Sequence, residues 1–506
     1  MRDVRAVGIY ALGAAVVVGA AVIRALSWLN CDVSWLLTIG EDVLGGARPY
    51  VDFSEPNPPA SFLIYLPAIV IARLMAVSAE SIVSGLLIVG TMASLWLAGH
   101  ILTGGGLLAA KEKSPLFVLA CVVLLILPGD AFAQREHVAL LAVLPMLSVY
   151  AVRADGAGVT RLLASLAGIG GGIAIAIKPY FALALALPLP YILWCGLAHR
   201  QKLGALILSP EHITAAAVLL AYGALLLLWF SDYLQQTLPL VLALYVPLKY
   251  SLLLMLDNPS VILVALVALI CLGAGAGELR APIIRVGALA VLGFTLSLII
   301  QGKGWPYHGY PAIALAMLVL SLVLVRRSSR AGDAIAKSVV IDLAFGGVLF
   351  ACIYGVASYW FLLEPSRAKL VSEVARLAPP HPKVVSFTEG PELAFPLMRK
   401  LHATAIARVP FQWVSHNAES LLASAQLTSP ARHRLEEYAR VDRAELAATI
   451  HTRQPDAILI GGQWELAWAL SHPEIAAALR PYRKAKTVDG VEIWLPLRRS
   501  GERRRN

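Results

Sequence analysis

Long apolar runs separated by short polar breaks fill the first two thirds of the chain. Many of these runs approach the roughly 20 residues that an α-helix needs to cross the hydrocarbon core of a bilayer. Of the 506 residues, 58% are hydrophobic and 15% are charged, and the mean hydropathy is +0.72. The pattern predicts a polytopic α-helical membrane protein. The first run, residues 6–29, lacks a clear small-residue cleavage site, so we expect it to remain as the first helix.

Lysine and arginine mark every second break between the runs. Because short loops rich in these residues stay in the cytoplasm, they predict a cytoplasmic N-terminus and about eleven crossings, with the C-terminal part outside. Two runs, 61–75 and 238–256, break this alternation and contain prolines, so we expect broken segments on the outer face. The basic sites are Arg2/Arg5, Lys111/Lys113, Arg153/Arg161, Arg200/Lys202, Arg280/Arg285 and Arg326/Arg327/Arg330.

Composition changes after the last apolar run, which ends near residue 363. The sequence therefore predicts a membrane module over residues 1–363, a small periplasmic α/β domain over 364–497 and a basic tail over 498–506. Anionic lipid head groups would attract the tail. Within the α/β domain we expect strands at 384–387 and 457–460, helices at 391–401 and 465–479, and a hairpin that turns at Asp489-Gly490.

The polar break at residues 32–59 is the longest in the first hundred residues and carries several carboxylates beside the membrane. Asp32 follows the first apolar run directly, and residues 35–44 predict a short amphipathic helix on the membrane that would fix it. Ordinary hydration of a loop charge is the alternative. Glu55 lies on the return of the same break.

Two further polar motifs fall on the predicted outer face. Arg135, Glu136 and His137 follow an apolar run, and one interpretation is that Arg135 or His137 meets a phosphate while Glu136 holds it in place. A helix-end charge cluster is the alternative. Lys178 and Tyr180 lie between two apolar runs, where a phosphate or a carboxylate is the natural partner of the lysine, unless the lysine extends to the interface.

The turn from Gln301 to His308 is the third outer motif. Its two glycines and one proline predict a turn whose backbone a ligand can approach. Lys303 and His308 are candidate anion contacts. Trp305 is a candidate for stacking on a sugar, and membership of the interfacial aromatic belt is an equal alternative.

Other patterns are discounted. The glycine runs 104–106 and 170–172 lack the Gly-Lys-Ser/Thr ending of a phosphate loop, and the second predicts close helix packing. The histidines of the C-terminal part lack metal-site spacing, and the five cysteines suggest neither a disulfide framework nor a thiolate cluster. We predict no metal site and no nucleic-acid partner.

The combined pattern resembles the GT-C superfamily of integral-membrane glycosyltransferases. The resemblance rests on Asp32 after the first run, a return with Gly46, Tyr50 and Asp52, Asn-Pro-Pro at 57–59 and the charged junction at 134–137. It is nearest to the branch of protein O-mannosyltransferases and of the aminoarabinose and galacturonic acid transferases of lipopolysaccharide. The second acidic residue of that branch falls on Val33 here, and Glu55 is the candidate substitute.

The resemblance implies an enzyme of the bacterial inner membrane that takes a sugar from a polyprenyl-phosphate donor. The acceptor would be a periplasmic glycan, lipid or protein. Asp32 would be the catalytic carboxylate, with Glu55 as second candidate, and the cations would stabilise the leaving phosphate. A divalent-cation requirement stays open. A transporter or flippase for anionic lipid-linked glycans, or a glycan ligase, are the alternatives.

Overall fold

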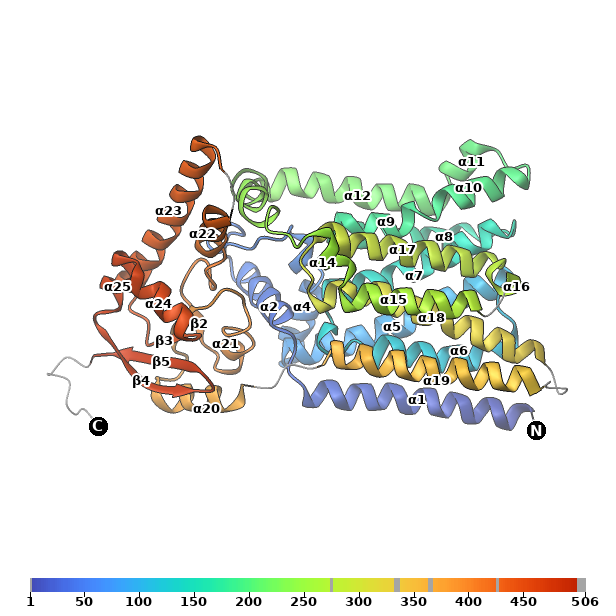
Figure 1. Ribbon diagram of the computed structural model, residues 1–506, viewed down its shortest axis with the longest axis horizontal. Coiled ribbons are helices and arrows are strands. Elements are labelled where there is room, and N and C mark those ends of the chain that lie inside the picture. The colour runs from blue at the N-terminus through green and yellow to red at the C-terminus, as the bar shows by residue number, and fades with distance from the viewer. Residues whose placement is uncertain (1, 274–275, 332–336, 363–366, 425–426, 498–506) are drawn as a thin grey trace. The chain divides into compact units, whose positions relative to one another are not determined.

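The fold is described from a computed structural model, which describes residues 2–273, 276–331, 337–362, 367–424 and 427–497. The predicted basic tail lies outside these residues. The chain divides into two compact units (Figure 1). The first holds Met1–Ser27, Pro67–Leu228 and Lys249–Glu364, and the second holds Trp28–Leu66, Trp229–Leu248 and Pro365–Asn506. Each unit is described by itself.

The first unit is a bundle whose long helices have roughly aligned axes (Figure 1). Helix α7 contacts α5, α8 and α17, and α18 contacts α17, α15 and α6. The longer helices are α1 (Arg2–Leu26), α5 (Ala79–Gly104), α6 (Ala110–Cys121), α7 (Arg135–Ala154), α8 (Arg161–Ile177), α10 (Leu189–Ala198), α12 (Pro210–Trp229), α15 (Pro259–Gly273), α17 (Pro282–Gln301), α18 (Pro306–Ala331) and α19 (Lys337–Trp360). The short ones are α4 (Leu66–Met75), η1 (Val122–Ile126), η2 (Gly129–Ala131), η3 (Pro179–Phe181), α9 (Ala182–Ala186), α11 (Leu203–Ile207), α14 (Leu252–Leu256) and α16 (Ala276–Leu279).

Seven helices of the described residues are long and apolar enough to cross a membrane. Four shorter apolar helices of 10–17 residues accompany them. The chain is therefore a helical membrane protein, whereas the predicted count of about eleven crossings is not established by helix length. The difference arises because several predicted spans are short, and because α6 passes at Cys121 into the π-helix η1.

Glycines let the helices of the bundle approach closely. A Cβ on Gly170 would lie 2.3 Å from the carbonyl oxygen of Ala142 in α7, and one on Gly168 would lie 2.1 Å from that of Glu211 in α12. Real Cβ atoms do not approach an oxygen so closely, so α8 packs against its neighbours only with glycine at these positions. The predicted role of the glycine run 170–172 in helix packing is confirmed.

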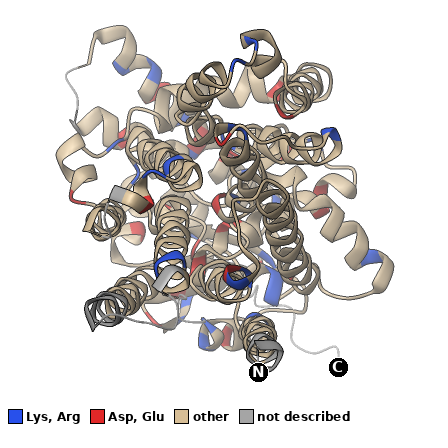
Figure 2. Ribbon diagram, turned by 90° about the vertical axis from the view of Figure 1, so that its right-hand side faces the viewer, with Lys and Arg blue, Asp and Glu red and all other residues tan. Residues whose placement is uncertain are grey.

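The basic residues used for the topology prediction gather at one end of the first unit, which we call the basic end. Lys111 at the start of α6 donates to the carbonyl of Ser329, and Arg326 of α18 donates to that of Leu107. Arg153 ends α7. Figure 2 looks at this end and shows Lys and Arg on several helix ends and loops. Which side of a membrane this end faces stays a prediction.

The second unit contains a five-stranded sheet of order β2-β1-β3-β5-β4. Strands β1, β2 and β3 pair in parallel, and β5 pairs antiparallel with both β3 and β4. The strands are β1 (Lys383–Phe387), β2 (Thr404–Ala405), β3 (Ala457–Ile460), β4 (Tyr482–Val488) and β5 (Val491–Pro496). The helices are α2 (Cys31–Leu44), α3 (Ala60–Leu63), η4 (Tyr233–Thr237), α13 (Leu238–Leu240), η5 (Val241–Tyr245), α20 (Ala368–Leu377), α21 (Leu397–Lys400), α22 (Trp413–Ser424), α23 (Ser429–Arg453), α24 (Gln463–Ser471) and α25 (Pro473–Leu479).

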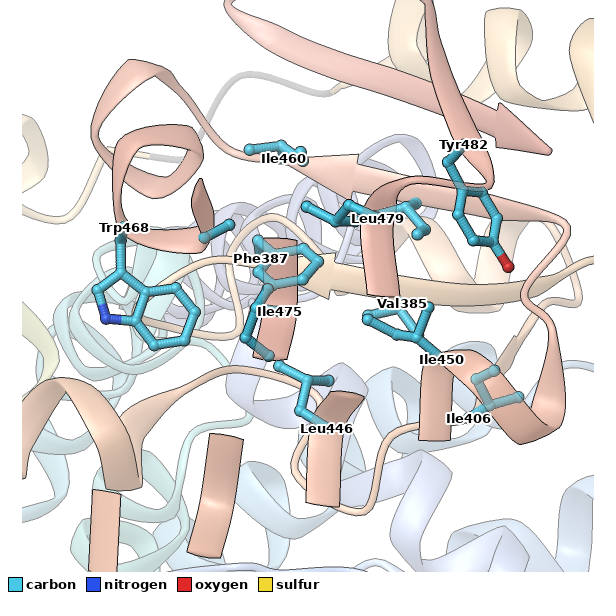
Figure 3. Close-up of a cluster of buried hydrophobic side chains, with 12 residues drawn as sticks. Val385, Phe387, Ile406, Leu446, Ile450, Ile460, Trp468, Ile475, Leu479 and Tyr482 are labelled. Carbon is cyan, nitrogen blue, oxygen red and sulfur yellow. The ribbon is translucent and has the colours of Figure 1, made fainter. Parts of the chain in front are cut away.

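A hydrophobic core joins the sheet to the helices of the second unit (Figure 3). Phe387 of β1 and Ile460 of β3 are fully buried and lie with Trp468 of α24 and Leu479 of α25 in this core. Every residue of β3 is buried, which is expected of a central strand covered on both faces.

Several predictions for this region are confirmed. Strands form at 383–387 and 457–460, and the hairpin turns at Asp489 (φ +48°) and Gly490 (φ +81°), both in the left-handed region that a type I′ turn requires. Two helix predictions are wrong in extent. Only Leu397–Lys400 of the expected 391–401 is helical, after Pro396, and the expected helix 465–479 is divided by Pro473.

The expected amphipathic helix near 35–44 forms as α2, but protein covers its apolar residues. The Trp35 ring lies 5.1 Å from that of Phe395 and 6.4 Å from that of Phe411. Arg399 makes a bidentate ion pair with Glu41 at 2.7 and 2.9 Å. The interpretation of a helix lying on the membrane is therefore corrected, because apolar periodicity shows that one face is buried but not what buries it.

The segment Trp28–Leu66, which contains α2, belongs to the second unit together with the C-terminal residues. The backbone N–H of Ser54 donates to the carbonyl of Arg408 at 2.9 Å, and the Arg408 guanidinium donates to the carbonyl of Val51 at 3.0 Å. The expected membrane module of residues 1–363 thus contributes Trp28–Leu66 and Trp229–Leu248 to the second unit.

Candidate functional site

Four helix ends bring polar side chains together at the end of the first unit opposite the basic end. Because successive helices run in opposite directions, the start of α7, the end of α8, the end of α17 and the start of α18 meet there. They carry Glu136, Lys178, Gln301 and His308. All four residues are buried. We call this group the Lys178 cluster.

Lys178 is the centre of the cluster. Its ammonium lies 2.5 Å from Oε1 of Glu136, 3.2 Å from Oε1 of Gln301 and 3.1 Å from Nε2 of His308. Nε2 of His308 lies 3.6 Å from the same Glu136 oxygen. The lysine is buried, and one of its partners is the Glu136 carboxylate, as the sequence predicted for a phosphate or a carboxylate.

His308 lies in a positively charged environment. Lys178, Arg135 and Lys303 all act electrostatically on its imidazole, and Arg135 is itself only 3% exposed. Glu136 contacts Lys178 through Oε1, and within the described residues its second oxygen, Oε2, has no hydrogen-bond partner. Nδ1 of His308 likewise has none there. Basic side chains gathered in this way favour binding of an anion such as a phosphate.

Lys303 lies on the predicted turn between α17 and α18. Gly302 (φ +65°) and Gly304 (φ +69°) flank it in the left-handed region that favours glycine, so the predicted tight turn is present. Burial, together with the nearby charge of Lys249, lowers the pKa of Lys303 to about 8. An anion beside this ammonium would relieve both effects.

The aromatic residues of the turn flank the cluster. The Trp305 ring is 40% exposed and lies 5.2 Å from the His308 ring and 5.7 Å from that of Tyr307. The Lys178 ammonium lies 5.9 Å from the centroid of Tyr307. An exposed indole beside buried cations fits both interpretations of Trp305, sugar stacking and membrane belt.

Two other candidates have different surroundings. Tyr180 is half-buried, and its carbonyl accepts a hydrogen bond from Ser297 at 2.7 Å. His137 is fully buried, its Nδ1 accepts from the Ala133 N–H at 3.3 Å, and its ring lies 5.3 Å from both Phe132 and Tyr310. These contacts describe packing at the start of α7, and a phosphate contact of His137 stays a prediction.

Arg24 lies near the start of α7 and is not among the site residues predicted from the sequence. It is 7% exposed, donates to the carbonyl of Gly129 at 2.8 Å and lies 4.2 Å from the centroid of Phe132. An arginine near the end of an apolar run was the available signal.

The two predicted catalytic carboxylates lie in the second unit. Asp32 is in the first turn of α2, is half-buried, and its backbone N–H donates to the Asn30 side chain at 2.8 Å. Glu55 is 1% exposed; its Oε2 accepts from the Trp35 indole at 2.7 Å, and its Oε1 accepts from the N–H of Asn57 at 2.9 Å and from the Asn57 side chain. The hydrogen bonds of Glu55 therefore fix the end of the 32–59 loop in place, whereas the Asp32 side chain is partly exposed to solvent.

A second ion pair, between a half-buried arginine and a buried glutamate, lies at the basic end of the bundle and was not predicted from the sequence. Arg153 of α7 donates to both oxygens of Glu211 in α12, at 3.1 and 3.3 Å. The neighbouring Tyr150 hydroxyl lies 2.8 Å from Nε2 of His212.

Comparison of the chain with protein-family models and with curated proteins finds no match. Within the described residues, no group of three or more His, Cys, Asp or Glu side chains is arranged to hold a metal ion. The Lys178 cluster holds one ammonium, one carboxylate, one amide and one imidazole, and Arg135 and Lys303 add positive charge around His308. Basic side chains of this kind are typical contacts of a phosphate.

Proposed function

We propose that this protein transfers a sugar from a polyprenyl-phosphate-linked donor to a glycan, lipid or protein acceptor at the outer face of a bacterial inner membrane. The observation that carries the proposal is the gathering of three basic side chains, Lys178, Arg135 and Lys303, around His308 at the end of the bundle opposite the basic end. Basic side chains stabilise a phosphate and the charge that develops on it, and the donor offers that phosphate. The resemblance to the GT-C superfamily supplies the reaction.

The donor phosphate would bind to Lys178, Arg135 and Lys303. In the transfer step the acceptor hydroxyl oxygen forms a bond to the anomeric carbon, and the bond between that carbon and the phosphate oxygen breaks. The hydroxyl proton passes to the Asp32 carboxylate, and polyprenyl phosphate leaves with the electron pair. The cations stabilise the charge that develops on the leaving phosphate. The exposed Trp305 ring is the candidate contact to the sugar.

Further parts of the proposal rest on sequence. About eleven crossings would place the C-terminal residues in the periplasm, where they would shape access for the acceptor. Glu55 is the second candidate carboxylate, although its two oxygens already accept hydrogen bonds from Trp35 and Asn57.

The reaction is tested with purified full-length protein in lipid nanodiscs. We would supply polyprenyl-phosphate sugars, radiolabelled in the sugar, with membrane extracts as acceptor. Transfer releases polyprenyl phosphate and labels the acceptor. A transporter would instead move the intact donor across vesicles without cleaving it, and a ligase would require a preassembled glycan donor. Either of these results would overturn the proposal.

The role of Asp32 has its own test. Asp32→Asn keeps the shape and removes the charge, so transfer should lose about 3 to 5 kcal/mol of transition-state stabilisation while donor affinity changes little. Glu55→Gln is the comparison, because its NH₂ group would face a hydrogen-bond donor and lower stability by roughly 1 to 3 kcal/mol. If Asp32→Asn transfers normally and folded Glu55→Gln does not, the base is Glu55.

A further inference from the structure

An apolar cavity of about 650 Å³ lies within the first unit, in the half nearer the basic end. Helices α1, α5, α6, α7, α17 and α18 contribute to its wall. Two wall serines, Ser148 and Ser321, donate to carbonyls of their own helices, so they add little polarity. A space of this size equals that of many ligand sites and exceeds the voids of a packed interior.

The lining contains one lysine and one histidine, and both lie at the same end. His100 on α5 and Lys113 on α6 line it there, close to the end of α5 and the start of α6. The remaining wall is mainly leucine with smaller glycine, alanine and valine residues, and its hydroxyl groups belong to Tyr10, Thr103, Ser148 and Ser321. The His100 ring stacks on Trp96 at 5.5 Å, and the Trp96 ring is 66% exposed. The cavity thus offers a cationic end and an apolar body, with exposed wall residues beside it.

The length of the cavity matches one leaflet of a bilayer. Its wall on α5 extends from Met92 to Gly104, which is about 18 Å at 1.5 Å per residue. Half of a hydrocarbon core measures about 15 Å. The wall is also separate from the Lys178 cluster, because its nearest residue on α18, Leu315, lies about 10 Å along the helix from His308.

We propose that this cavity holds one acyl chain of an anionic phospholipid whose phosphate meets Lys113 and His100. The chemistry of the wall selects the occupant, since a negatively charged head group complements the cationic end and a chain of one-leaflet length fills the rest. The site is independent of the transferase proposal. A lipid held there would fill the space between α5, α6 and α18 and would stay bound when lipids around the protein exchange.

Glycines of α5 provide a matched pair of variants for the test. Gly99 lines the cavity, and a Cβ on it would meet nothing within 4 Å, so Gly99→Phe fills the cavity without a backbone clash. Gly90 lies nine residues earlier on α5, is exposed and also has open space for a Cβ, but it does not line the cavity. Gly90→Phe therefore controls for an added aromatic ring on the same helix.

The full-length protein would be placed in nanodiscs of phosphatidylethanolamine and phosphatidylglycerol in equal parts and examined by native mass spectrometry. We expect the parent and Gly90→Phe to retain one phosphatidylglycerol, and Gly99→Phe to lose most of it at an equal thermal unfolding midpoint. Lys113→Gln should reduce the preference for phosphatidylglycerol about fivefold.

Three results would overturn the proposal. Gly99→Phe could retain as much phosphatidylglycerol as Gly90→Phe, the parent could hold only exchangeable lipid, or the lipid retained from cell membranes could be polyprenyl phosphate. The last result would assign the cavity to the donor chain.

Discussion

Two ion pairs, one buried and one with a half-buried arginine, lie at opposite ends of helix α7 and are built differently. Glu136 and Arg153 are 17 residues apart, about 26 Å along the helix. Arg153 donates to both oxygens of Glu211, so that pair is balanced in charge and in hydrogen bonds. Glu136 meets Lys178 with one oxygen only, and Arg135 and Lys303 add further positive charge around His308.

The difference separates a structural pair from a candidate binding site. A saturated pair joins two helices and offers nothing to a ligand. The Lys178 cluster, with the positive charge of Arg135 and Lys303 beside it, has the capacity to bind an anion. Its folded state should also tolerate the loss of Lys178 better, because these cations remain.

The largest expected effect is on stability, at the basic end. Arg153→Met leaves the Glu211 carboxylate buried without its partner, which should cost about 3 to 5 kcal/mol of unfolding free energy. Lys178→Met should cost less, because His308 lies 3.6 Å from Glu136 and cations remain nearby. Thermal unfolding in detergent would measure both. An equal or larger loss for Lys178→Met would show that its cluster is also a structural pair.

The second effect is on transfer. Glu136→Gln/Lys178→Met removes both charges together, so the fold should persist, while transfer should fall about a hundred- to thousandfold because a phosphate contact is lost. The matched control is Arg153→Met/Glu211→Gln, which should transfer at nearly the parental rate. Similar rates for the two folded double variants would remove the Lys178 cluster from the mechanism.

The smallest effect is a pH dependence set by Lys303. Its pKa is lowered to about 8, so the charged form is disfavoured in the folded protein. Stability should therefore rise as the pH increases through 8 and level off near the ordinary lysine value of 10.5. Donor phosphate favours the charged form, so donor affinity should fall over the same range, and binding at pH 8 to 9 should take up a fraction of a proton.

Calorimetry of polyprenyl phosphate binding in buffers of different ionisation enthalpy would measure the proton uptake. Lys303→Arg keeps its charge throughout and should abolish the pH dependence. Lys202→Arg, at an exposed lysine of the basic end, is the control and should leave it unchanged. A pH profile that Lys303→Arg does not alter would exclude Lys303 from phosphate binding.

Local sequence determined a large part of the fold. Apolar run length predicted the membrane helices, Gly170 predicted close packing of α8, and Asp489-Gly490 predicted the hairpin turn. Each of these features depends on residues that are neighbours in the chain. The expected helices at 391–401 and 465–479 were too long, because proline lacks a backbone N–H and interrupts a helix, here at Pro396 and Pro473.

The sequence placed Lys178 between two apolar runs and predicted a phosphate or a carboxylate as its partner, with extension to the interface as the alternative. Only the tertiary structure decided that the partner is Glu136, 42 residues away, with His308, 130 residues away, as a third member. It also decided that α2 buries Trp35 against Phe395 and Phe411. Hydropathy and periodicity record how strongly a residue avoids water, whereas pairing depends on which distant helix ends the packing brings together.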